Sequence, residues 1–174
     1  MRIISSTARF MVVILAIFCL AGCGHKKDAE GCFKDGVSAL NAHKHEEAVM
    51  LFDEAIAKNP KYAAAYFYRG TALFSLGRRN EALDSYNKSI EIAPNIPQTY
   101  YNRGNALASL SMHVEAVASY DKALELSPNH VKAYYNRGLE LMKMGKKEEA
   151  DLSFKKAHDL DPRLQAPDAT PKQK

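Results

Sequence analysis

The side chains best suited to metal binding or nucleophilic chemistry in this 174-residue chain are its three cysteines and six histidines. The histidines are His25, His43, His45, His113, His130 and His158. Only His43 and His45 stand close together, and no cysteine lies near enough in sequence to complete a tetrahedral zinc site with them. We interpret both as exposed turn residues. The sequence contains neither a glycine-rich phosphate loop nor a nucleophile elbow, so we expect no metal site, no cofactor and no enzymatic activity.

Cys23 stands at the end of an apolar stretch near the start of the chain. Arg2 and Arg9 flank a short polar segment, and an apolar run over residues 10–21 follows. A helix of a dozen residues reaches ~18 Å, which is too short for a ~30 Å hydrocarbon core, so a secretory signal is favoured over a transmembrane anchor. The four residues "LAGC" that end at Cys23 resemble the lipobox of bacterial lipoproteins.

The lipobox resemblance implies that the chain is cleaved before Cys23 and that the cysteine thiol and the new amino terminus are acylated. Two or more acyl chains give stable membrane anchoring. We therefore expect a signal peptide over residues 1–22, and the lipidated cysteine with a short linker over 23–28. Because Gly24 rather than an aspartate follows, we expect an outer-membrane location facing the periplasm.

Charge gives no sign of a nucleic-acid partner. Removing Arg2 and Arg9 from the 24 Lys and Arg residues leaves 22, against 20 Asp and Glu residues. No basic block stands out beyond Lys26 and Lys27.

Four kinds of residue recur every 34 positions along the rest of the chain. The glycines are Gly36, Gly70, Gly104 and Gly138; the alanines are Ala48, Ala82, Ala116 and Ala150; the aromatics are Phe52, Tyr86, Tyr120 and Phe154; the prolines are Pro60, Pro94, Pro128 and Pro162. Four such series at one period indicate an internal repeat without insertions.

Each unit has the pattern of two helices joined by a tight turn. Apolar residues recur at spacings of three and four in both halves of a unit, and a proline marks the end of the second half. Gly77 and Gly145 fit the left-handed position that ends the first helix. His43 and Ser111 occupy this position in the first and third units, which predicts strained or remodelled turns there.

These units resemble the tetratricopeptide repeat, most clearly in "YYNRGNAL…EAVASYDKALELSP" of the third unit. The resemblance implies an all-α superhelix, an α-solenoid, of four helix-turn-helix repeats at about 29–62, 63–96, 97–130 and 131–164, whose first helices line a concave groove. Cys32 replaces the opening aromatic of the first unit, and we expect it to be a small core residue. Residues 165–174 are polar and contain proline, which predicts a disordered tail.

The predicted groove carries the candidate partner-binding residues. They are Phe33, Val37, Phe67, Thr71, Tyr101, Asn105, Tyr135 and Leu139. Leu40, Phe74 and Met142 fit equally well as contacts buried between repeats. The carboxylate clamp known in this family is not supported, because Phe33 and Val37 stand where it requires Lys and Asn.

The sequence thus predicts a membrane-anchored, non-catalytic scaffold that binds protein or peptide partners of the bacterial envelope. The alternative is a self-associating structural lipoprotein, in which an apolar edge of the last helix (Leu152, the Lys156 stem and Leu160) pairs with another copy. A further series, Arg69, Arg103 and Arg137, is expected to lie over neighbouring helices in a structural role.

Overall fold

The computed structural model describes residues 27–164 and 166–167, so the predicted signal peptide, Cys23 and most of the predicted tail lie outside the described residues. The described chain forms eight α-helices and no strand. They are α2 (Ala29–Asn41), α3 (His45–Lys58), α4 (Ala63–Ser75), α5 (Arg79–Ile92), α6 (Pro97–Ser109), α7 (His113–Leu126), α8 (Val131–Lys143) and α9 (Lys147–Leu160). Two helices per 34 residues confirm the predicted all-α repeat. None of these helices is long and apolar enough to span a bilayer.

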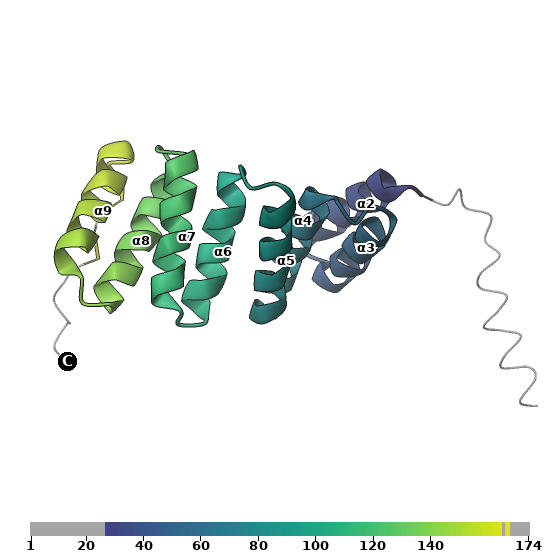
Figure 1. Cartoon of the computed structure of the whole chain (residues 1–174), viewed down its shortest axis with the longest axis horizontal. Coiled ribbons are helices and arrows are strands. Elements are labelled where there is room, and N and C mark those ends of the chain that lie inside the picture. Colours follow the sequence, from purple (N-terminus) through teal and green to yellow (C-terminus); the bar gives the residue numbers. More distant parts are fainter. Residues whose placement is uncertain (1–26, 165, 168–174) are drawn as a thin grey trace, which may run out of the picture.

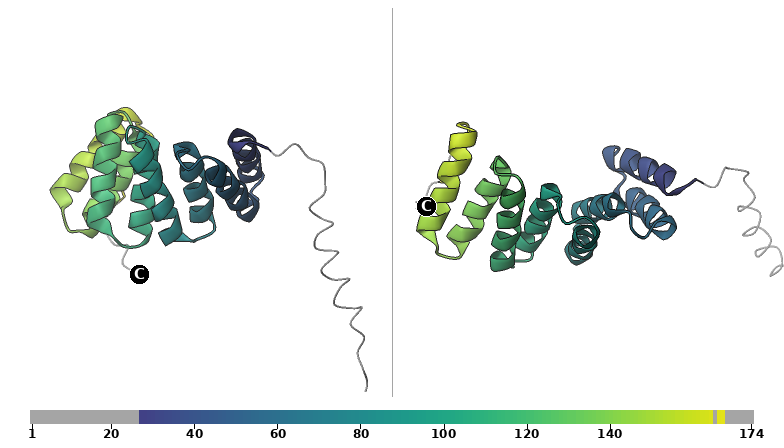
Figure 2. Two further views of the ribbon diagram at one scale, coloured as in Figure 1. Left: turned by 45° about the vertical axis from the view of Figure 1, so that its right-hand side comes forward. Right: turned by 45° about the horizontal axis from the view of Figure 1, so that its top comes forward.

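The helices stack as four hairpins in chain order (Figure 1). Each second helix also packs against the first helix of the next hairpin. Successive first helices α2, α4, α6 and α8 touch one another, whereas the backbones of the second helices of the described chain do not come close to each other. The first helices therefore form the inner layer of a curved row, and the row twists along its length (Figure 2).

Turn geometry follows the sequence pattern closely. Gly77 and Gly145 have φ of 76° and 75°, in the left-handed region that glycine tolerates best. His43 and Ser111 adopt φ of 58° and 60° at the equivalent positions, which confirms the strained turns predicted there. A non-glycine residue in this region costs about 1 kcal/mol or more.

The recurrent glycines allow the two helices of each hairpin to approach. A Cβ atom built on Gly104 would lie only 2.5 Å from Cε1 of Tyr120, and Gly36, Gly70 and Gly138 face Phe52, Tyr86 and Phe154 in the same way. These rings are almost fully buried. The glycine and the aromatic of each unit thus form one packing device, repeated four times.

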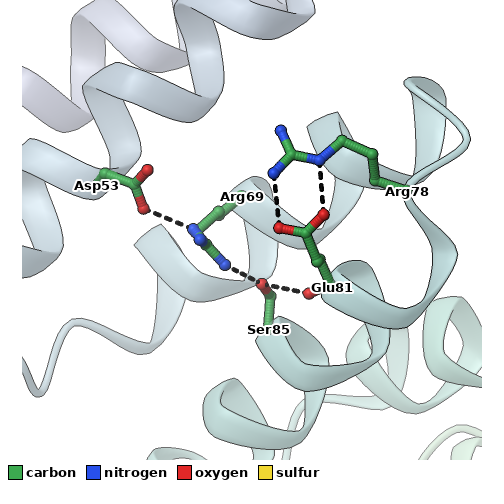
Figure 3. Close-up of polar contacts among 5 residues, drawn as sticks. All are labelled: Asp53, Arg69, Arg78, Glu81 and Ser85. Carbon is green, nitrogen blue, oxygen red and sulfur yellow. Dashed lines mark hydrogen bonds and ion pairs between the residues drawn. The ribbon is translucent and has the colours of Figure 1, made fainter.

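The recurrent arginines link adjacent repeats. Arg69 on α4 donates through Nε to Asp53 on α3 at 2.6 Å and through Nη1 to Ser85 Oγ on α5 at 2.7 Å (Figure 3). Arg78 and Glu81 form a separate two-bond pair nearby. Each recurrent arginine therefore joins the second helices of two successive hairpins, as the structural interpretation of the series predicted. Arg137 repeats the arrangement with Asp121 and Ser153, at 2.6 Å each.

Arg103 has the weakest version of this link, because Asn87 stands where its equivalents meet an aspartate. Its Nη1 lies 3.4 Å from Asn87 Oδ1, and burial lowers the pKa of the guanidinium. We expect Asn87→Asp to stabilise the chain by about 0.5–1 kcal/mol, the upper range for a partly exposed ion pair. Urea unfolding at low and at 1 M salt measures the gain and its screening. An equal gain in an Arg103→Gln background would contradict the explanation.

Candidate partner-binding face

The eight predicted groove residues lie on one face of the inner helices, here called the inner face. All eight are half-buried, neither enclosed in the core nor fully exposed. They form two rows along the stack. The aromatic row is Phe33, Phe67, Tyr101 and Tyr135, and the second row is Val37, Thr71, Asn105 and Leu139.

Every member of the aromatic row packs against the core ring of its own hairpin. The ring centroids of Phe33 and Phe52 lie 5.9 Å apart, and those of Tyr135 and Phe154 lie 5.5 Å apart. The pairs Phe67–Tyr86 and Tyr101–Tyr120 are separated by 6.1 and 6.0 Å. These aromatics are therefore partly scaffold, and only their outer portions remain for a partner.

Each second-row residue has the same polarity as the core ring of its own hairpin. Where the core ring is a phenylalanine, the second-row residue is apolar: Val37 packs against the cluster of Phe52, and Leu139 packs against the cluster of Phe154. Where it is a tyrosine, the second-row residue is polar: Tyr120 donates to Asn105 Oδ1 at 2.8 Å, and Tyr86 lies 3.5 Å from Thr71 Oγ1. Burial raises the pKa of both tyrosines, which keeps their hydroxyls protonated donors.

The inner face is aromatic and apolar in its first half. Phe33 contacts Tyr62 and Tyr68, with ring centroids 4.9 and 5.5 Å away, and Phe67 lies 5.0 Å from Tyr68. Burial and the Glu30 carboxylate raise the pKa of Tyr62 to about 12, so its hydroxyl stays neutral at physiological pH. Phe74 is half-buried and packs against the same cluster.

The second half of the inner face is lined by amides instead. Gln98 donates to Asn102 Oδ1 at 2.9 Å, and Asn136 donates to Asn105 Oδ1 at 2.9 Å. The amide of Asn136 also reaches the Tyr101 hydroxyl at 3.3 Å. Sequence reasoning missed Tyr68 and Asn136 as part of this face. The available signal was their position, since each follows an aromatic-row residue directly.

His130 joins the inner face to the start of α8. Its Nδ1 accepts a hydrogen bond from the Ala133 backbone N–H at 3.3 Å, and its ring centroid lies 4.7 Å from that of Tyr101. This cap requires an unprotonated Nδ1. Burial lowers the pKa of His130 below its ordinary value of 6.5, and the nearby Lys132 acts in the same direction.

A pH-dependent loss of stability follows from this cap. Because the folded-state pKa is depressed, the contribution of His130 is fully present above about pH 6.5 and is lost as pH falls through the folded value. We expect His130→Asn, which keeps a capping acceptor, to remove this part of the acid destabilisation. Urea unfolding of both chains at pH 7.5 and 5.5 measures the difference. A stability gap between the chains that does not change with pH would contradict it.

Cys32, His43 and His45, the other residues considered for metal binding or nucleophilic chemistry, do not form a site together. Cys32 is only 1% exposed, which confirms its predicted place in the core, and Lys58 Nζ lies 3.0 Å from its Sγ. His43 is exposed as expected, but His45 is half-buried and its Nδ1 has no hydrogen-bond partner. Within the described chain, no three His, Cys, Asp or Glu side chains gather to hold a metal ion.

Comparison with solved structures places the fold among tetratricopeptide repeat arrays. A crystal structure of MamA is 24% identical with a TM-score of 0.75, covering 78% of this chain and 79% of that one. MamA from residue 41 onward of Desulfovibrio magneticus RS-1 is 22% identical with a TM-score of 0.74, covering 80% and 79%. A further MamA structure, MSR-1, is 24% identical with a TM-score of 0.71 and covers 90% of both chains. At these identities the likeness concerns the fold.

Sequence comparison supplies the family. No curated protein sequence matches the chain. Two models described as tetratricopeptide repeat do match it, one over residues 33–97 and the other over 97–130 and 131–164. Together these matches span most of the chain, from the first inner helix to the end of the fourth hairpin. The chain therefore belongs to the tetratricopeptide repeat family.

Proposed function

We propose that the chain is a non-catalytic scaffold whose inner face binds a segment of a partner protein. The observation that carries the proposal is the continuous double row of half-buried, uncharged side chains across all four inner helices. Half-buried aromatics supply apolar contact area at little entropic cost, since they are already held by their core partners. Such a face suits an extended or helical peptide segment.

The outer helices offer no comparable surface. Their exposed large apolar residues, Met50, Val114 and Leu152, are scattered on three different helices. Single exposed apolar side chains are ordinary on protein surfaces and need no partner. The inner face is thus the better candidate for recognition.

The change in chemistry along the inner face defines the kind of segment it fits. The aromatic half formed by α2 and α4 favours apolar side chains of a partner. The amide half formed by α6 and α8 offers Gln98, Asn102 and Asn136, which can pair with polar side chains or with backbone groups. The eight residues of the two rows carry no formal charge, and neither do Tyr68, Gln98, Asn102 and Asn136. We therefore propose a largely uncharged segment with its apolar residues over the first two repeats.

We further propose that the scaffold is tethered to the bacterial envelope through lipid on Cys23, in the outer membrane and facing the periplasm. The support for the lipid is the "LAGC" sequence and the short apolar run before it, and the support for the outer membrane is Gly24, which stands where an aspartate would favour the inner membrane. Metabolic labelling with a palmitate analogue tests this: the native chain should be labelled and Cys23→Ser should not. Labelling of both chains would contradict attachment at Cys23.

Photo-crosslinking in cells tests the binding face directly. Ser75 and Ser109 are exposed, and each lies one helical turn beyond a second-row residue on the same side of its helix. A photoreactive amino acid at either position should give adducts with a protein partner. The same residue at Met50 or Val114, exposed on outer helices, is the matched control. Adducts from the outer positions alone, or from none, would refute the proposed face.

Self-association through α9 is the alternative and stays a prediction. Leu152 is 69% exposed, Lys156 is exposed and Leu160 is half-buried, so the edge is accessible. Light scattering of the chain with Cys23→Ser over a range of concentrations tests it. A mass that remains monomeric and is unchanged in Leu152→Glu would exclude this edge as an interface.

A further inference from the structure

The side of α9 that points away from the rest of the stack differs from its equivalents in earlier hairpins. In those hairpins this side meets the next inner helix through apolar residues, such as Val49 packed near Ala72 and Val117 packed near Leu141. Asp151 stands at the position of Val49 and Val117, 34 residues along from Val117. His158 likewise replaces Ile56, Ile90 and Leu124.

The chain leaves α9 through the same corner that it uses between hairpins. Leu164 donates its backbone N–H to the Asp161 carbonyl at 3.0 Å, as Tyr62 does to Asn59 and His130 does to Ser127, both at 3.1 Å. The Arg163 guanidinium braces this corner with two bonds of 2.9 Å to the Asp161 carboxylate. After the earlier corners an inner helix begins, whereas the residues that follow Leu164 in the described chain are not helical.

The described residues after α9, 161–164 and 166–167, instead return beside α9 (Figure 1). His158 Nδ1 donates to the Leu164 carbonyl at 2.9 Å, which uses the polar residue that replaced Ile56 and its equivalents. Farther along, Ala166 and Pro167 line a cavity of about 320 Å³ together with Met142, Asp151 and Phe154. Leu164 and Pro167 are half-buried.

The geometry of the chain explains how the few residues after α9 reach from its end to its middle. An extended residue advances ~3.3 Å and a helical residue 1.5 Å, so a non-helical segment needs fewer than half as many residues as a helix to cover the same length. The segment can therefore pass from the end of α9 to its middle without forming a helix. There Ala166 and Pro167 line the same cavity as Phe154 and Met142.

We propose that residues 161–164 and 166–167 form a strap that substitutes for a further inner helix and holds α9 in place. The proposal goes beyond partner binding, and it stands or falls independently of it. The polar replacements on α9 fit the strap: His158 provides its hydrogen bond, and Asp151 keeps the uncovered remainder of that side compatible with water. A terminal repeat needs such a device, because its outer side has no neighbour.

Hydrogen exchange in three chain lengths tests the strap. The full mature chain, a chain ending at Pro167 and a chain ending at Leu160 are compared amide by amide. We expect the chain ending at Pro167 to match the full chain. Ending at Leu160 should accelerate exchange of the α9 amides tenfold or more, with those of α2 to α5 unchanged. Equal α9 exchange in all three chains would overturn the proposal.

A full-length variant separates loss of the strap from the new terminal charge that truncation places at the end of α9. Leu164→Gly with Pro167→Gly keeps the chain length and removes the two half-buried side chains of the strap. We expect it to accelerate α9 exchange severalfold. If this variant exchanges like the native chain, the two half-buried side chains do not hold α9 in place, and the proposal is wrong.

Discussion

Gly104→Ala is expected to destabilise the chain by about 2 kcal/mol, although alanine is the better helix former. The new Cβ would lie 2.5 Å from Cε1 and 2.7 Å from Cδ1 of Tyr120, a ring that is only 1% exposed. Overpacking of this kind costs about 1–3 kcal/mol. The upper end applies here, because a shift of the buried ring would also strain the bond from its hydroxyl to Asn105 Oδ1. The gain in helix propensity, about 1 kcal/mol, offsets only part of that cost.

Gly31→Ala is the matched control. Gly31 also lies inside a helix, but its Cβ would approach only Asp28 Oδ1 and the Lys27 side chain, at 3.2 Å or more. Here the helix propensity should dominate, giving a gain of up to about 1 kcal/mol. Urea unfolding of both variants measures the contrast. If the two substitutions change stability in the same direction, close packing does not explain the recurrent glycines.

The fold could be predicted from the sequence because the repeats give several independent indications of the same structure. The glycine, alanine, aromatic and proline series each predicted the same hairpin, and the turn residues His43 and Ser111 could be identified by comparison with Gly77 and Gly145. The aromatic row was also recognisable, since its members share one helical face. That these residues bind a partner remains a prediction, because packing against core rings explains part of their burial.

Contacts between repeats were harder to predict, because they join residues of different helices. His113 Nδ1 meets Glu140 at 2.6 Å, and this carboxylate is only 4% exposed. The equivalent of this pair one hairpin junction earlier is Arg79 and Ala106, and two junctions earlier it is His45 and Ala72. The unpartnered Nδ1 of His45 thus has a simple cause: an alanine stands where Glu140 stands. Neither histidine could be interpreted without knowing that the residue 27 positions later in the sequence lies next to it in the fold.

The strap could not be predicted from the sequence for a different reason. Residues after Leu164 have neither apolar periodicity nor helix-forming composition, so they predict no element. The place of Ala166 and Pro167 beside α9 depends on the corner at Asp161 and on His158, which become informative only when the fourth hairpin is compared with the other three.

Asn105→Leu is expected to cost about 2–3 kcal/mol, because it removes the acceptor of a buried hydroxyl. Tyr120 loses its bond of 2.8 Å to Asn105, and Asn136 loses one of 2.9 Å. Tyr120→Phe alone should cost about 1 kcal/mol, the usual net value of one hydrogen bond. Size is not the obstacle, since Leu139 and Phe154 occupy the same two positions in the fourth repeat.

The double variant Asn105→Leu with Tyr120→Phe should therefore recover about 1–2 kcal/mol relative to the sum of the single costs. Once the hydroxyl is gone, the leucine no longer leaves a buried donor unpaired, and the pair becomes the apolar combination found in the fourth repeat. Equilibrium unfolding of the four chains gives this coupling energy directly.

The second repeat supplies the comparison that makes the test selective. Tyr86 and Thr71 occupy the same positions, but their oxygens are 3.5 Å apart, at the limit of a hydrogen bond. The cycle Thr71→Val with Tyr86→Phe should give a coupling below about 0.5 kcal/mol. Additive costs at Asn105 and Tyr120, or equal coupling at both pairs, would show that polarity matching between the second row and the core rings does not govern the stability of these repeats. A large coupling at the first pair alone would mean that Asn105 is held by the scaffold, and that only its remaining hydrogen-bonding capacity is available to a partner on the inner face.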